Sequence, residues 1–65
     1  MSKFFEIMDS DHDSFASIRT SQVQAVLERI DEEDRPYTAI ITQHGLYQTW
    51  ELYVNVIEKL NGDHS

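Results

Sequence analysis

Hydrophobic and polar residues alternate over short stretches of this chain and follow a helical period only near its end. The segments KFFEIM (3–8) and FASIR (15–19) are rich in aromatic and β-branched residues, and the polar run DSDHDS separates them. This pattern predicts two strands joined as a hairpin. YTAIIT (37–42) predicts another strand, and Gly45 can supply the positive φ of a tight turn before a returning strand at 46–48.

The segment TWELYVNVIEKLNG near the end of the chain predicts an amphipathic helix. Thr49 is a suitable N-cap, and Lys59 suits the negative C-terminal end. Apolar residues recur at helical spacing along one side: Trp50, Tyr53, Ile57 and Leu60. We expect this stripe to pack on the sheet with Trp50 near its edge, and we expect Val54, which lies off the stripe, to face a partner.

The segment SQVQAVLERIDEED (21–34) fits two structures. Ser21 and Gln24 match a capping box, and the apolar residues that follow recur at helical spacing, so the local pattern favours a helix. Read as a strand, the segment alternates less regularly between apolar and polar residues, but the order of the flanking elements favours a strand. We therefore predict one α+β domain, residues 1–65, with a small antiparallel sheet of four to five strands and one C-terminal amphipathic helix. The alternative is ββαββα with residues 21–33 helical.

This order of elements resembles the small FlbD-like flagellar proteins and similar short proteins encoded by phages and prophages. The matching positions are Ser21, Gln22, Val23, Val26, Gly45, Thr49, Glu51, Val56, Ile57 and Leu60. The resemblance implies a sheet with a C-terminal helix, and a single turn at 21–23 leading into a strand. It includes no catalytic motif. It suggests a phage-type inhibitor of a host nucleic-acid-handling complex, or a small regulator or assembly factor of the flagellar type. Genome neighbourhood would distinguish the two roles.

The charge of the chain limits its partners. Twelve acidic residues against five basic ones give a formal net charge of −7, and the basic residues are scattered. Direct binding to nucleic acid or to an anionic membrane is therefore not expected, whereas a protein with a basic surface fits. The acidic run Asp31, Glu32, Glu33 and Asp34 is the candidate contact, and Trp50 and Tyr53 are candidate interface anchors. With no apolar run of about 20 residues, we expect a cytoplasmic protein.

Motifs for chemistry are incomplete in this sequence. Asp9, Asp11 and Asp13 have the first spacings of a calcium loop, but the required Gly and closing Glu are replaced by Ser14 and Thr20. The chain has no cysteine, and its histidines lack a metal-binding spacing. We expect no metal, no cofactor and no enzymatic activity. The predicted sheet has unpaired edges, and a small core gains by burying a second apolar face, so we expect a two-fold homodimer.

Overall fold

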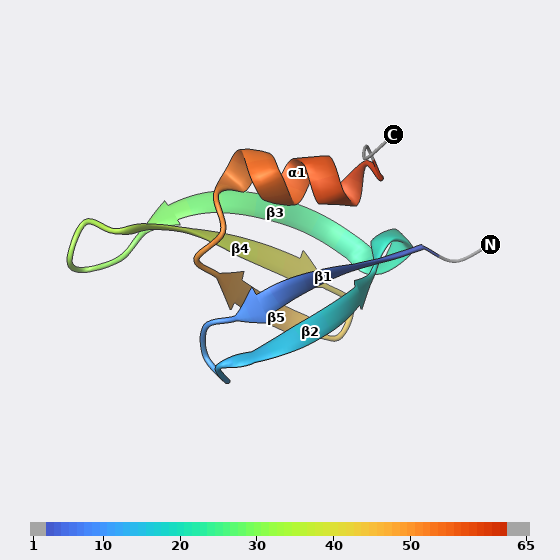
Figure 1. Cartoon of the computed structure of the whole chain (residues 1–65), viewed down its shortest axis with the longest axis horizontal. Coiled ribbons are helices and arrows are strands. Elements are labelled where there is room, and N and C mark those ends of the chain that lie inside the picture. Colours follow the sequence, from blue (N-terminus) through green and yellow to red (C-terminus); the bar gives the residue numbers. More distant parts are fainter. Residues whose placement is uncertain (1–2, 63–65) are drawn as a thin grey trace.

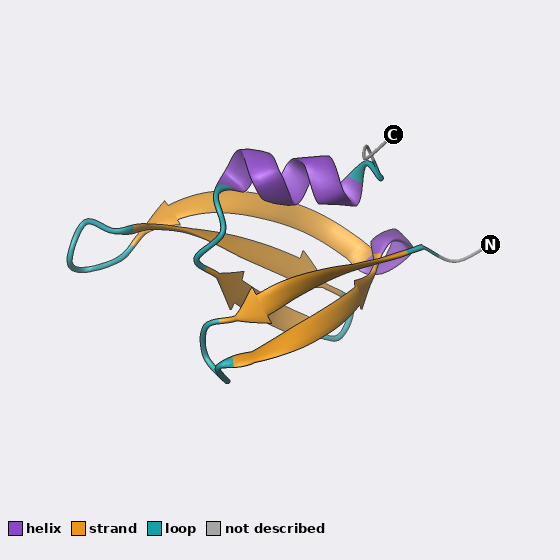
Figure 2. Ribbon diagram, in the orientation of Figure 1, coloured by secondary structure: helices purple, strands orange, loops and turns teal. Residues whose placement is uncertain are grey.

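The computed structural model describes residues 3–62, which form five strands, a 3-10 turn and one α-helix (Figures 1 and 2). This confirms the predicted α+β class and the C-terminal position of the helix. The elements are β1 (Phe4–Asp9), β2 (Ser14–Arg19), η1 (Thr20–Gln22), β3 (Val23–Ile30), β4 (Pro36–Thr42), β5 (Gly45–Thr49) and α1 (Tyr53–Leu60).

The strands form two antiparallel sheets and not the single sheet that the sequence predicted. β1 pairs with β2, and β3, β4 and β5 form a three-stranded sheet in that order. The turn η1 separates β2 from β3, so the chain leaves the first hairpin before it enters the second sheet (Figure 1). The backbone N–H of Ser10, just after β1, donates to the carbonyl of Gln48 in β5 at 2.8 Å. The strands therefore surround one core.

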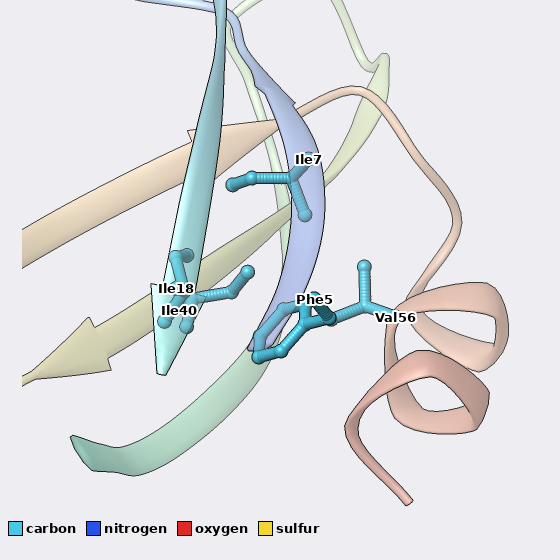
Figure 3. Packing of buried hydrophobic residues seen from close by; sticks show 5 residues of the cluster. All are labelled: Phe5, Ile7, Ile18, Ile40 and Val56. Atoms are coloured by element: carbon cyan, nitrogen blue, oxygen red, sulfur yellow. The ribbon is translucent and has the colours of Figure 1, made fainter. Parts of the chain in front are cut away.

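The core lies where the hairpin, the three-stranded sheet and the helix meet (Figure 3). Its buried cluster consists of Phe5, Ile7, Ile18, Ile40 and Val56. β1 alternates strictly between buried and exposed residues, so one of its faces packs inward and the other faces solvent. This core is small, and each of its side chains matters to the fold.

Residues 23–30 form a strand, so the alternative with a helix at 21–33 is wrong. The turn expected at 21–23 is present one residue earlier, at Thr20–Gln22. The register of β3 against β4 shifts between Val23 and Ala25, which is a β-bulge. The extra residue lets Val23 and Val26 point to the same face of the strand, and both pack against the core. Apolar residues at helical spacing are thus accommodated in a strand.

The helix begins later than predicted. Thr49 does not cap it but ends β5, where it is buried and its Oγ1 accepts a hydrogen bond from the N–H of Glu51 at 3.3 Å. The N-cap is Leu52, which has no side-chain capping bond. Trp50 therefore lies before the helix. Val56 is the buried residue of α1, whereas Tyr53, expected on the buried stripe, is 38% exposed.

Candidate protein-interaction site

The loop between β3 and β4 carries the acidic run at one end of the molecule (Figure 1). We call residues 31–35 the acidic loop. Its four carboxylates against one guanidinium leave a net charge of −3. The backbone N–H of Asp31 donates to the carbonyl of Arg35 at 3.0 Å, and that of Asp34 donates to Asp31 at 3.1 Å. The loop is therefore folded on itself and presents its charge in a defined shape.

Asp31 holds this shape. Its Oδ1 accepts hydrogen bonds from the backbone N–H groups of Glu33 (2.9 Å) and Arg35 (2.8 Å), and its Oδ2 accepts one from Arg35 Nε (3.1 Å). These bonds, first of all that from the backbone of Arg35, lower the pKa of the Asp31 carboxyl. Because its oxygens are already in use, Asp31 positions the loop, whereas its neighbours are the groups that a partner can reach.

Arg35 connects the loop to Trp50. Its guanidinium pairs with Glu33 Oε1 at 3.0 Å and lies 4.8 Å from the centre of the Trp50 ring, a cation–π distance. The Trp50 ring also meets Tyr37 edge to face, with centroids 6.1 Å apart. The structure therefore brings Trp50 next to the acidic run. We did not single out Arg35 from the sequence, although its position four residues after Asp31 suggests the pairing.

Within the acidic loop, Glu32 and Asp34 are the exposed carboxylates that form no salt bridge with residues 3–62. Asp34 has a φ of 63°, a left-handed conformation that Asp and Asn tolerate better than most residues. Tyr53, the other predicted anchor, borders a small hollow with Pro36 and Tyr37, directly after the acidic loop. The six predicted contact residues thus lie around one end of the three-stranded sheet.

A second surface was not singled out from the sequence. Residues that alternate along β3, β4 and β5 form the sheet face turned away from the core, which we call the outer face. Its members are Ala25, Leu27, Arg29, Tyr37, Ala39, Ile41, Leu46 and Gln48. The signal in the sequence is YTAIIT, where apolar residues occupy both faces of the strand.

The turn between β1 and β2 is held by the side chain of Asp9. Asp9 is buried, its Oδ1 accepts a hydrogen bond from the N–H of Asp11 at 3.0 Å, and its Oδ2 lies 2.9 Å from His12 Nδ1. The hydrogen bond with His12 lowers the pKa of Asp9, and it raises the pKa of His12. Within residues 3–62 no three metal-ligating side chains gather in one place. His12 is exposed, but its Nδ1 is paired with Asp9.

The Asp9–His12 pair has two of the three parts of a hydrolytic triad, but the hydroxyl of nearby Ser10 donates to the carbonyl of Gln48 at 3.3 Å. A groove of about 840 Å³ lies between β1 and α1. It is open to solvent, and Lys59 in its wall is bound to Glu51 Oε1 (2.6 Å) and to the carbonyl of Glu6 (2.8 Å).

Comparisons of this chain with protein-family models, with curated proteins and with solved structures found no match. Within the part of the chain that the structure describes, no helix has the length and apolar character needed to cross a membrane.

Proposed function

We propose that this chain is a non-enzymatic, acidic protein–protein interaction module that binds a partner with a basic surface. Glu32, Glu33 and Asp34 make the electrostatic contact, and Trp50 and Tyr53 lie beside them as apolar anchors. The observation that supports this most directly is the preformed acidic loop, in which Asp31 and Arg35 fix the backbone while Glu32 and Asp34 face solvent. A loop that is already ordered loses little conformational entropy when it binds.

We further propose that the partner is a host nucleic-acid-handling complex and that the chain is its phage- or prophage-encoded inhibitor. A surface that holds phosphates is basic, and the net charge of −3 over residues 31–35 suits such a surface. An inhibitor of this kind competes with nucleic acid for the partner. A regulator or assembly factor of the flagellar type would bind without that competition.

The experiment begins with chemical cross-linking of the tagged chain in extracts of its native host. The captured protein is then purified, and its association with the chain is measured at low and at high salt. The test variant is Glu32→Gln/Asp34→Asn. Since opposite charges steer encounter, we expect its on-rate at low salt to fall by about three- to tenfold and its salt dependence to flatten. Added DNA or RNA should compete with the wild type.

The chain offers a matched control in Asp11→Asn/Asp13→Asn, on the turn between β1 and β2. Both double variants remove two carboxylates from exposed turns, and Asp13, with a φ of 55°, has the same left-handed backbone as Asp34. The control should keep most of the wild-type on-rate. Equal loss in both variants would mean that net charge matters and the acidic loop does not. Unchanged association of the test variant at every salt concentration would overturn the proposal.

A further inference from the structure

The outer face is an apolar surface with Ala39 at its centre, which is 3% exposed, and with exposed leucines on its two edge strands. In antiparallel strands, paired residues point to the same side, so Leu27, Ala39 and Gln48 share one face, next to the pair Ile41 and Leu46. The core residue Ile40 points to the opposite side, where the β1–β2 hairpin and α1 pack. Leu27 and Leu46 are exposed, and so is Trp50, whose ring stands against Tyr37 at one end of the face.

Charge is distributed unevenly between this face and the rest of the molecule. The chain has twelve acidic residues and a net charge of −7, yet none of the eight positions of the outer face is Asp or Glu. Its one charged member is Arg29, at the end of the face near the acidic loop. The outer face is therefore the part of the sheet surface where two copies of this chain can approach without opposing carboxylates.

We propose that the outer face binds a second copy of the chain, so that two three-stranded sheets stack face to face in a two-fold dimer. A surface that meets its own copy about a two-fold axis must be complementary to itself. An apolar, carboxylate-free face meets this condition, whereas the acidic loop would repel its copy. The sequence predicted a homodimer but not the surface that forms it. The outer face includes none of the acidic-loop carboxylates that make the proposed partner contact, and it meets that site only at Trp50.

The small size of the core favours a second copy of the chain, and not an unrelated protein, as the molecule that covers the outer face. Among the described residues six hydrophobic side chains are buried, namely Phe5, Ile7, Ile18, Ala39, Ile40 and Val56. A single core in a chain of this length rarely supplies more than about 3 to 5 kcal/mol, and small proteins often add a disulfide, a metal or an oligomeric contact. This chain has no cysteine. A second sheet packed at about 10 Å on the outer face would extend the core across the interface.

The area of the face sets the strength of the dimer. Three strands about 4.8 Å apart and about five residues long give a face of roughly 15 by 17 Å. Two such faces cover about 500 Å² of flat area, which is less than the ~1,200 Å² at the lower end of stable interfaces. We therefore expect a reversible dimer with a micromolar dissociation constant. The arrangement that places the two acidic loops at opposite ends is favoured, because it separates them and leaves both accessible.

The test is the oligomeric state of the full chain by analytical ultracentrifugation from about 1 µM to 1 mM, at about 0.15 M and 1 M salt. We expect a monomer that converts to a dimer within this range. The dimer should be stronger at high salt, because the contact is apolar while the net charge of −7 opposes association. Trp50, the one tryptophan of the chain, should shift its fluorescence to the blue as the dimer forms.

Leu46→Lys and Leu52→Lys form a matched pair of variants. Both leucines are 56% exposed, but Leu46 lies on the outer face and Leu52 lies next to α1 on the other side. Each change makes the net charge of the chain less negative, so a loss of the dimer cannot come from a larger net charge on the two copies. Leu46→Lys should stay monomeric throughout, with unshifted Trp50 fluorescence. Leu52→Lys should dimerise at least as well as the wild type.

Leu27→Lys tests the same face from β3, in case Leu46→Lys fails to fold. Far-UV circular dichroism confirms that each variant is folded. A wild type that remains monomeric up to about 1 mM, where even weak interfaces associate, would overturn the proposal. So would a folded Leu46→Lys or Leu27→Lys variant that still dimerises. Loss of the dimer in Leu52→Lys alone would place the contact at the helix instead.

Discussion

Two acidic turns, which begin at Asp9 and at Asp31, look alike in the sequence. In each of them the first carboxylate has a different role from the carboxylates that follow it. Asp9 and Asp31 each accept a hydrogen bond from the backbone N–H two residues later, and each also binds a nearby basic side chain. The later residues Asp13 and Asp34 each adopt a positive φ. In both turns the first carboxylate therefore builds the backbone, and the following ones are left to face solvent. The sequence alone does not show which carboxylate of an acidic run holds the backbone, because this depends on which residues the hydrogen bonds of the turn join.

The Asp9–His12 pair should make stability depend on pH. The pKa of His12 is raised by Asp9 in the folded chain, so the contribution of the charged imidazole is full below the unfolded pKa of about 6.5 and is lost as the pH rises through the folded pKa. The pKa of Asp9 is lowered, so its contribution is lost as the pH falls below about 3.8. The pair stabilises most between these limits.

Urea unfolding of His12→Asn and the wild type should therefore differ most near pH 5 and least above about pH 8. His44→Asn is the control, because the ring of this other turn histidine forms no hydrogen bond within residues 3–62. Its effect on the free energy of unfolding measures what loss of a turn imidazole costs when no carboxylate is paired with it. If the effect of His12→Asn did not change between pH 5 and pH 8, the pair would contribute nothing to stability.

At the scale of elements, local patterns predicted those elements whose signals lie within a few residues. Alternation gave the β1–β2 hairpin and β4, and Gly45 marked the turn into β5. The strand β3 was predicted from the order of the elements, since its bulge makes the spacing of Val23 and Val26 look helical. The start of α1 was missed because Thr49, a good cap by type, is paired with Thr38 across β4 and β5.

Contacts between distant segments could not be predicted. The Ser10–Gln48 hydrogen bond spans 38 residues and joins the end of β1 in one sheet to β5 in the other. At the candidate site, the acidic run and Trp50 were predicted as separate features, and Arg35 joins them only in the folded chain. The outer face requires knowledge of which side of the sheet the helix covers, which no local pattern states.

Val56 is the buried residue of α1, which gives a prediction for this element. Val56 is 0% exposed and packs in the core, whereas Val54 is 55% exposed on the same helix. Val56→Ala removes buried methyl groups and leaves a cavity, so it should lower the free energy of unfolding by about 1 to 3 kcal/mol. Val54→Ala should change it by less than about 0.5 kcal/mol. Urea unfolding measures both, and equal effects would show that the helix does not dock through Val56.

The whole molecule combines two surfaces of opposite character. The acidic loop concentrates negative charge at one end of the three-stranded sheet, and the outer face of the same sheet carries no carboxylate. Trp50 lies where the two meet, held by Arg35 from the loop and by Tyr37 from the face. A dimer through the outer face would therefore present two acidic loops to the outside. Two loops on one particle can bind a partner with two sites more tightly than one loop alone.

Self-association should also be visible in thermal stability. If the folded chain dimerises and the unfolded chain does not, Tm must rise with protein concentration once the dimer is populated. Above the dissociation constant, a tenfold increase in concentration stabilises each protomer by about 0.7 kcal/mol, which is about 3 to 6 °C for a domain of this size. Calorimetry from about 10 µM to 1 mM should show this rise for the wild type and for Leu52→Lys. Leu46→Lys should unfold at one temperature throughout, equal to that of the dilute wild type, because residue 46 lies outside the core. A wild-type Tm that does not change with concentration would mean that the chain folds and functions as a monomer, with the outer face left open to a different protein.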